Sequence, residues 1–214
     1  MWSRDVGQKR GFPIVVSAPS GTGKTTICRR VASCLPGVSC SISATTRPPR
    51  EGEVDGVDYD FLDEQTFRSW IRDRRFCEWA VVHGHYYGTV RKNLEEALSR
   101  GSKVIMALDV NGGEAIGRLY EDAVLVYLLP PSEETLRERL LGRGTEGKEA
   151  MEKRIEDARK ELSRVGNYHY VIVNRSVDQS VERIKSIVVA EECRVERQDL
   201  SGLLRSLGDL EPAP

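Results

Sequence analysis

The sequence of 214 residues lacks long apolar runs, an excess of charge of either sign, and regularly spaced cysteines. No stretch approaches the roughly 20 apolar residues of a membrane-spanning helix, and the polar first ten residues lack the apolar centre of a secretory signal. Basic and acidic residues number 32 and 33, so the net charge of −1 gives no general argument for binding nucleic acid or membranes. We therefore expect a cytoplasmic protein, a monomer or homo-oligomer, with neither kind of partner.

The five cysteines form no CxxC pair, and their number is odd. Because the cytosol is reducing, we expect no disulfides. The three histidines, His83, His85 and His169, fall in segments with a β-like pattern and have no metal-ligating partners. We expect these cysteines and histidines to be ordinary core or surface residues.

One stretch, residues 14–26, carries a strong functional signal and reads IVVSAPSGTGKTT. Its apolar start is typical of a buried strand, its small residues of a tight loop, and the residues after Lys24 of a helix, which is the setting of a phosphate-binding P-loop. Backbone N–H groups and a helix N-terminus directed at one point favour an anion. Lys24 adds a positive charge for the β- and γ-phosphate oxygens, and the Thr25 hydroxyl can reach a Mg²⁺ ion.

The P-loop pattern begins with glycine, and Ala18 stands at that place. Alanine fits there only if its φ angle is negative. The alternative is a chance turn of small residues, but the strand, loop, Lys-Thr pair and helix all agree with a nucleotide site. The predicted ATP-binding loop comprises Ala18, Pro19, Ser20, Gly21, Thr22, Gly23, Lys24 and Thr25.

Predicted strands and helices alternate along the chain, so the expected fold class is α/β, with a P-loop parallel sheet core flanked by helices. A stretch rich in β-formers and aromatic residues, about 43–90, interrupts this alternation. Within it, residues 43–59 have neither a helical nor a strand period and are expected to be a loop, and Phe61 begins the next strand. Core strands are expected at 12–17, 38–42, 102–109, 123–129 and 168–174, and helices at 24–35, 63–74, 91–98, 111–120, after 132, and at 148–165 and 177–195.

Three further features suggest ligand contacts. Arg47 and Arg50 lie three apart around a stiff Pro-Pro pair, which suggests a second anion site, with a solvated charge run as the open alternative. Asp109 ends a predicted buried strand, where parallel sheets bind ligands. The glycine-rich segment LLGRGTEGKE carries Arg143 between two predicted helices and predicts a mobile lid.

Together these motifs resemble guanylate kinase over nearly all of residues 12–193. The resemblance rests on SAPSGTGKTT, SISATTRPPREGEVDGVDY, FCEWAVVHGHYYGT, LDVNGG, LLGRG and YVIVN. It implies the reaction ATP + GMP = ADP + GDP, in purine nucleotide metabolism and GMP recycling. It also implies an inserted mixed-β GMP-binding region at 43–89 and a short helical lid at 139–165. The core would then comprise 12–42, 90–138 and 166–195 of a 12–195 domain, with a flexible lead at 1–11 and a tail at 196–214.

The resemblance also implies a GMP site. Glu78 matches the acid that recognises guanine, because a carboxylate accepts from the N1–H and the exocyclic amino group. Adenine lacks that donor pair, so an unpaired buried acid would reject AMP. Asp109 matches a second acid near the base, and Thr89 a residue that touches it. The GMP phosphate would be held by Ser43, Arg47, Arg50, Tyr59 and Tyr87.

On the ATP side, other guanylate kinases also carry alanine at the first P-loop position. The residues expected to stabilise the transferred phosphoryl group are Lys24, Arg47, Arg139, Arg143 and Arg154. Asn174 matches a residue near the adenine. Mg²⁺ is expected to bind together with ATP, with Thr25 as its protein ligand.

One position departs from the family. Members commonly carry an acid two residues before the position of Asp109, and here that residue is Ala107. Such an acid would help to hold the Mg²⁺ shell, so we predict a weaker Mg²⁺ requirement or a lower turnover.

Two other classes of function stay open on the sequence. A guanylate-kinase-like binding module without catalysis would explain Ala107, but it has no need of Lys24, Thr25 or the lid arginines. A P-loop kinase for another phosphorylated substrate has no need of Glu78 beside the predicted phosphate-binding tyrosines and arginines.

Overall fold

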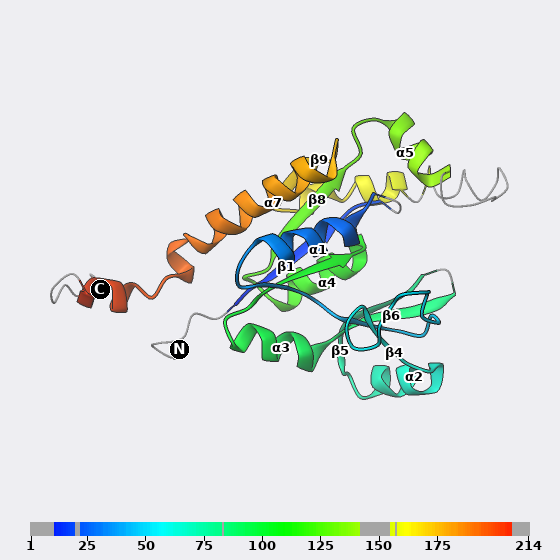
Figure 1. Cartoon of the computed structure of the whole chain (residues 1–214), viewed down its shortest axis with the longest axis horizontal. Helices are drawn as coiled ribbons and strands as arrows, with labels where there is room; N and C mark the ends of the chain where they lie inside the picture. Colours follow the sequence, from blue (N-terminus) through cyan, green and yellow to red (C-terminus); the bar gives the residue numbers. More distant parts are fainter. Residues whose placement is uncertain (1–10, 20–21, 83, 142–154, 157, 207–214) are drawn as a thin grey trace.

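A computed structural model describes residues 11–19, 22–82, 84–141, 155–156 and 158–206. The chain forms two sheets with helices around them, and Figure 1 shows the smaller sheet below the larger one. The elements are β1 (Pro13–Ser17), α1 (Lys24–Cys34), β2 (Val38–Cys40), β3 (Ser43–Thr45), β4 (Tyr59–Phe61), α2 (Glu64–Arg72), β5 (Phe76–Val82), β6 (His85–Val90), α3 (Arg91–Ser99), β7 (Lys103–Leu108), α4 (Val110–Leu119), β8 (Val124–Leu129), α5 (Glu133–Leu141), η1 (Val165–Asn167), β9 (Tyr170–Val173), α7 (Val177–Glu192), η2 (Val195–Arg197) and α8 (Leu200–Ser206).

The larger sheet has five parallel strands in the order β2-β7-β1-β8-β9. Side chains alternate along its central strand, so Ile14 and Val16 pack with α1 and α7 on one face, while Val15 packs with α3 and α4 on the other. Both faces are therefore covered, as a parallel sheet of apolar strands requires. This confirms the predicted α/β core.

The smaller sheet has four strands in the order β4-β3-β6-β5 and is mixed, because β3 pairs parallel with β4 and antiparallel with β6. Its own core centres on Phe67 of α2, which is fully buried and stacks on Phe76 with ring centroids 4.4 Å apart. Asp63 caps α2 by accepting a hydrogen bond from Thr66 N at 2.8 Å, a role for which aspartate is favoured.

The expected loop at 43–59 is partly wrong. Ser43–Thr45 is strand β3, and the next strand begins at Tyr59 rather than at Phe61. A segment of three residues is too short to show a period of two in the sequence. Its pairing depends on β4 and β6, which lie far along the chain, so only the folded sheet reveals it.

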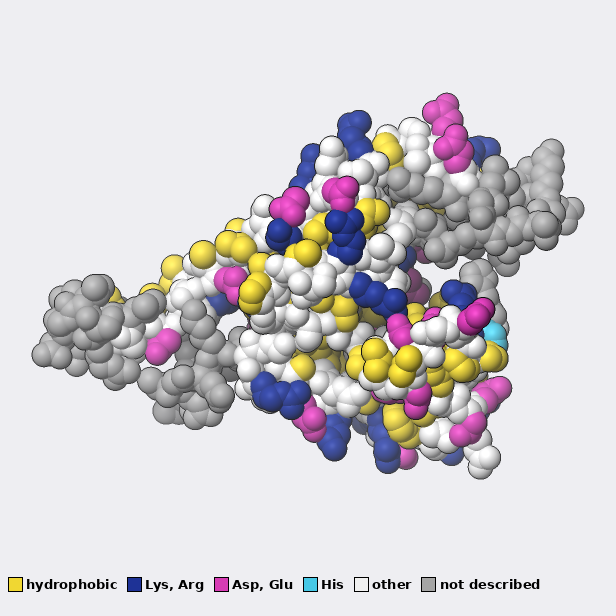
Figure 2. All heavy atoms as spheres, in the orientation of Figure 1, with side chains coloured by type: hydrophobic (Ala, Val, Ile, Leu, Met, Phe, Trp, Pro, Cys, Tyr) yellow, Lys and Arg dark blue, Asp and Glu magenta, His cyan; other side chains and the backbone are white. Residues whose placement is uncertain are grey.

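The carboxyl-terminal part begins to pack on the core and then leads away from it, on the left of Figure 1. Arg197 Nη2 donates to Asp122 O at 2.8 Å and pairs with Glu191 at 3.0 Å, and its guanidinium lies 3.8 Å from the ring centroid of Phe12. On the face shown in Figure 2, basic and acidic side chains alternate rather than gather by sign. Within the described residues, no helix has the length and apolar character needed to cross a membrane.

Candidate active site

The P-loop links the central strand to α1. Lys24 Nζ donates to Ala18 O at 2.5 Å, and Thr22 Oγ1 donates to Pro19 O at 2.9 Å. Gly23 has φ of 82°, a conformation that favours glycine, whereas Ala18 is not among the described residues with positive φ. Alanine at the first position is therefore unstrained, as the sequence required.

Asn174 supports this loop from the end of β9. It is buried, its Nδ2 donates to Thr22 O at 2.8 Å, and its Oδ1 accepts from Ser180 Oγ at 2.9 Å. The amide thus joins the P-loop to the start of α7. The resemblance implied a residue near the adenine, and the structure adds a specific hydrogen bond to the loop itself.

Arg47 is oriented by an acid that the sequence analysis missed. Its Nη2 contacts both carboxylate oxygens of Glu53 at 2.8 and 2.9 Å, and Glu53 also accepts from Arg50 N at 2.8 Å. The hydrogen bond from Arg50 N lowers the pKa of Glu53, and the bonds and charge of Arg47 lower it further, while partial desolvation opposes them. The GEVDG segment contains this acid, but a carboxylate in a polar loop is indistinguishable from a solvated one until the turn is folded.

The predicted phosphate-binding hydroxyls lie together on the smaller sheet. Ser43 is in register with Tyr59 on one side and Thr89 on the other, so these three side chains share a face. Tyr87 lies two residues from Thr89 on the same face, and its ring centroid is 6.1 Å from that of Tyr59. The Arg47 guanidinium lies 5.4 Å from the Tyr59 ring centroid, so the arginine and the hydroxyls converge.

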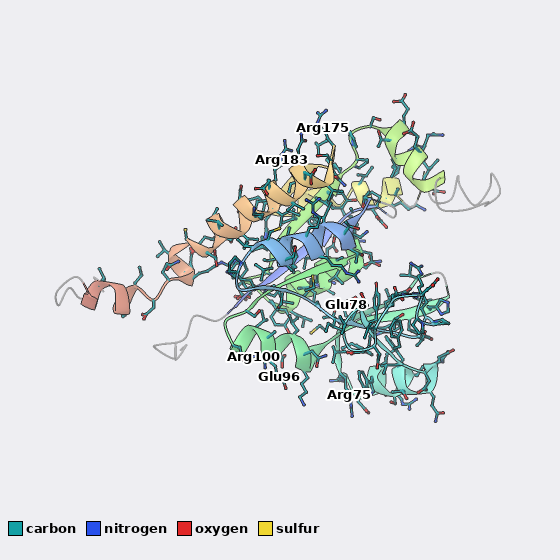
Figure 3. All side chains as sticks on the ribbon, viewed as in Figure 1. Arg75, Glu78, Glu96, Arg100, Arg175 and Arg183 are labelled. Carbon is teal, nitrogen blue, oxygen red and sulfur yellow. The ribbon has the colours of Figure 1, made fainter. Side chains whose placement is uncertain are left out.

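Glu78 lies at the border between the two sheets, where Figure 3 labels it. Its Oε1 accepts from Thr89 Oγ1 at 2.6 Å, and a Cβ placed on Gly112 would come within 2.9 Å of its Oε2. Burial raises the pKa of the Glu78 carboxyl, the hydrogen bonds from Thr89 oppose this shift, and the nearby Asp109 carboxylate adds to it. Asp109 itself caps α4 by accepting from Gly112 N at 2.8 Å.

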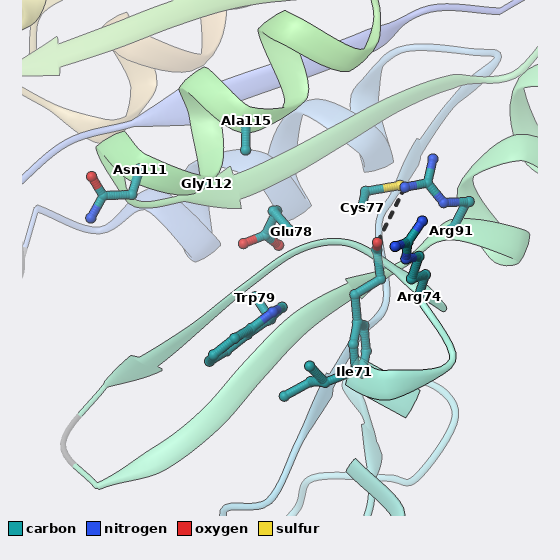
Figure 4. Close-up of a pocket in the computed structure, with 10 residues that line it drawn as sticks. Ile71, Arg74, Cys77, Glu78, Trp79, Arg91, Asn111, Gly112 and Ala115 are labelled. Atoms are coloured by element: carbon teal, nitrogen blue, oxygen red, sulfur yellow. Dashed lines mark hydrogen bonds between the residues drawn. The ribbon is translucent and has the colours of Figure 1, made fainter. Parts of the chain in front are cut away.

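A cavity of about 370 Å³ adjoins Glu78. Figure 4 shows it between α4, the strand β5 and the end of α2, with Glu78 directed toward Gly112 and Trp79 on the opposite wall. The remaining lining residues are Ile71, Arg74, Phe76, Cys77, Arg91, Asn111 and Ala115. None of the residues predicted to hold the GMP phosphate lines it, and the only predicted GMP-binding residue among its lining is Glu78.

Some predicted site residues cannot be placed. Ser20, Gly21, Arg143 and Arg154 lie outside the described residues, and Arg139 lies in α5 but its side chain is not described. Thr25 is exposed at the start of α1, and Arg50 is exposed in the loop after Arg47.

The described residues offer few ligands for a metal ion. Ala107 lies in β7 beside Val16 of β1 and contributes no oxygen from its side chain. Among the described residues, no group of three or more His, Cys, Asp or Glu is arranged to hold a metal. This donor set fits an ion that takes most of its ligands from nucleotide phosphates and water.

Comparisons with known proteins agree on one family. The guanylate kinase family model matches residues 10–191. The guanylate kinase of Caldanaerobacter subterraneus subsp. tengcongensis is 44% identical over 190 residues, covering 89% of this chain and 92% of that protein. That of Myxococcus xanthus is 45% identical over 199 residues, covering 92% and 95%. A crystal structure of guanylate kinase from Anaplasma phagocytophilum is similar with a TM-score of 0.76 and 31% identity, covering 95% of this chain and 98% of that one.

Proposed function

The chain belongs to the guanylate kinase family and transfers a phosphoryl group from ATP to GMP, and from this premise we propose which of its residues bind and orient the reacting groups. The observation that carries the assignment is the convergence of Arg47, Tyr59 and Tyr87 on one face of the smaller sheet, with Glu78 at its inner border. A nucleoside monophosphate needs both parts, one for its phosphate and one for its base.

We propose that Arg47, Arg50, Ser43, Tyr59 and Tyr87 hold the GMP phosphate. Arginine offers a planar fork of donors to a dianion, and the hydroxyls complete the hydrogen bonding. The contact of Nη2 with both oxygens of Glu53 orients the Arg47 guanidinium before substrate arrives, which lowers the entropy lost on binding.

We propose that Glu78 recognises guanine, with Thr89 and Asp109 beside it. Thr89 donates to one oxygen of Glu78, which orients the carboxylate toward the N1–H and amino group of guanine. A base without these donors would leave the partly buried carboxylate with fewer hydrogen bonds than guanine provides, and such a loss is costly.

The phosphoryl transfer depends on alignment and neutralisation of charge more than on covalent chemistry. The P-loop with Lys24 binds the ATP phosphates, and we propose that Arg139, Arg143 and Arg154 of a lid at 139–165 approach the transferred group. The attacking phosphate of GMP has a second pKa of about 6, like other monoesters. It is mostly ionised at neutral pH, so the site needs no strong general base.

A divalent metal ion accompanies ATP in this family, and we propose that it is Mg²⁺. The Thr25 hydroxyl would hold it, together with phosphate oxygens and water, and it would neutralise charge on the β- and γ-phosphates. Ala107 leaves that shell without its usual nearby acid, so the other groups carry more of the binding.

We also propose a cytoplasmic location, with neither nucleic acid nor membrane as a partner. The five cysteines support it, since all are free thiols, as expected in a reducing compartment. The division into a core, a GMP-binding region at 43–89 and a lid is likewise a proposal, supported by the separate sheets and hydrophobic cores.

The test is ADP release with MgATP and GMP, and with AMP, UMP and CMP as controls, in the wild type and in Glu78→Gln. We expect GMP-selective turnover, with selectivity reduced in the variant. Unchanged selectivity would remove Glu78 from base recognition. If GMP bound without release of ADP, the chain would instead be a guanylate-kinase-like binding module without catalysis, and Ala107 would be the suspected cause of the lost activity.

A further inference from the structure

An ion pair joins α1 of the core to the loop that precedes β4. Arg29 Nη2 lies 2.5 Å from Asp58 Oδ1, and the Asp58 side chain is 17% exposed against 53% for Arg29. Arg29 follows Thr25 by one helical turn, so it belongs to the helix that begins at the P-loop. Asp58 immediately precedes Tyr59, the first residue of β4. The pair therefore links the ATP side of the cleft to the GMP side.

Asp58 also fixes the conformation of its own loop. Its Oδ2 accepts from Val54 N at 2.8 Å, and its backbone N donates to Val54 O at 2.9 Å. Gly56 N donates to Tyr59 O at 2.9 Å, and Tyr59 enters the sheet in register with Ser43. The position of the Tyr59 ring relative to α1 thus depends on where Asp58 is held.

The charge of Arg29 acts at the Tyr59 hydroxyl. Burial raises the pKa of Tyr59, and the nearby Tyr87 raises it further. The positive charges of Arg47 and Arg29 oppose this shift. Arg29 therefore lies close enough to influence the group to which we assign the GMP phosphate, although it belongs to the other side of the cleft.

We propose that Arg29 and Asp58 form a latch that positions Tyr59, and with it the acceptor phosphate of GMP, against the P-loop helix. Both are positioning residues, since they act through Tyr59. The inference rests on the proposed role of Tyr59 in binding that phosphate. A neighbouring pair provides a comparison, because Arg30 of the same helix pairs at 2.7 Å with Asp178 of α7. Both α1 and α7 pack on the larger sheet, so this exposed pair does not connect to the smaller sheet.

The test measures KM for GMP, KM for ATP, kcat and Tm in Arg29→Gln, Asp58→Asn and the double variant, with Arg30→Gln as the matched control. Asparagine keeps an acceptor for Val54 N, so Asp58→Asn removes mainly the charge. For a partly exposed pair we expect each single variant to raise KM for GMP about 2- to 5-fold. KM for ATP and Tm stay near wild type, and Arg30→Gln changes neither KM. The double variant should be no worse than either single variant, because both remove the same interaction.

Two outcomes would overturn the latch. One is an Arg29→Gln variant with the same KM for GMP as Arg30→Gln, and the other is a double variant whose effect is the product of the two single effects. Tyr59→Phe separates the latch from its premise. If Tyr59→Phe leaves KM for GMP unchanged, the proposed role of Tyr59 is wrong and the latch falls with it. If Tyr59→Phe raises KM while Arg29→Gln does not, the latch alone is wrong.

Discussion

At the scale of single residues, the site depends on a carboxylate placed where ionisation is unfavourable. Glu78 is partly buried, lies near Asp109 and accepts a hydrogen bond from Thr89 at 2.6 Å. Its raised pKa means that the folded protein holds this proton more tightly than the unfolded chain does. The contribution of Glu78 to stability therefore falls as pH rises from the ordinary carboxyl range through the raised pKa. The role in guanine recognition that we propose for Glu78 needs the ionised form, so binding and stability would oppose each other at this residue.

This opposition predicts the behaviour of Glu78→Gln. We expect KM for GMP to rise about 10- to 100-fold at neutral pH, because a hydrogen bond to a charged group is lost. The Tm of the variant at neutral pH should exceed that of the wild type, because the variant lacks the partly buried charge. This difference in Tm should vanish at pH values below the ordinary carboxyl pKa, where Glu78 is protonated in both the folded and the unfolded state. In the wild type, KM for GMP should fall as pH rises through the Glu78 pKa, and the variant should lack this contribution to the pH dependence. Any pH dependence of KM that remains in the variant reports ionisation of the GMP phosphate. An equal pH dependence of KM in both proteins would contradict the prediction.

Ala107 stands where guanylate kinases commonly carry an acid. Ala107→Asp places a carboxylate in β7 beside the strand that leads into the P-loop. We expect the Mg²⁺ concentration for half-maximal activity to fall about tenfold, a typical effect of a residue that supports a metal shell. Calorimetry of ATP binding with and without Mg²⁺ gives a readout independent of turnover. If neither metal affinity nor rate changes, the residue is not a determinant of Mg²⁺ use in this chain.

At the scale of elements, short segments are held by contacts with distant parts of the chain. Strand β3 has three residues, and its position follows from pairing with β4 and β6. The P-loop is likewise supported by Asn174, 152 positions away from Thr22. Patterns in the sequence reveal elements in which a helical or strand period persists over many residues, or which contain a long apolar run. They do not reveal the contacts between elements, because those contacts depend on the topology.

The support of the P-loop by β9 predicts the effect of Asn174→Ala. The losses include the buried hydrogen bonds to Thr22 O and from Ser180 Oγ, and the free energy of unfolding should fall by about 1–3 kcal/mol. KM for ATP should rise several-fold, whereas KM for GMP should change little. Ser180→Ala is the matched control, because it removes only the bond to Asn174 Oδ1 and should have a smaller effect on KM for ATP. Equal effects of the two variants would mean that the contact with Thr22 is unimportant.

At the scale of the whole molecule, the segment after α7 is fastened to the amino-terminal side of the core. Glu191 is buried, accepts from Tyr170 at 2.5 Å and pairs with Arg197 at 3.0 Å. The Arg197 guanidinium covers the Phe12 ring. These contacts show that the tail, expected at 196–214, packs on the core at least as far as Arg197.

Arg197→Ala should therefore destabilise the protein. Removing one partner leaves the buried Glu191 carboxylate less compensated, at a cost of about 3 kcal/mol, which corresponds to a fall in Tm of about 6–12 °C. Arg194→Ala is the control, because Arg194 pairs with the same carboxylate at 3.6 Å and is 56% exposed, so its loss should cost about 0.5 kcal/mol or less. Thermal unfolding measures both, and equal losses would contradict a special role for Arg197.

The sequence by itself determined the α/β core, the P-loop and the family. The reason is that these depend on local patterns: apolar runs, a Gly-rich loop before a helix, and contiguous motifs. Only the tertiary structure decided that Glu53 orients Arg47, that Asn174 supports the P-loop, and that Arg29 meets Asp58 across the cleft. The sequence does not reveal which residues of the chain these polar side chains contact. Their partners are set by how strands and loops far apart in the chain are brought together.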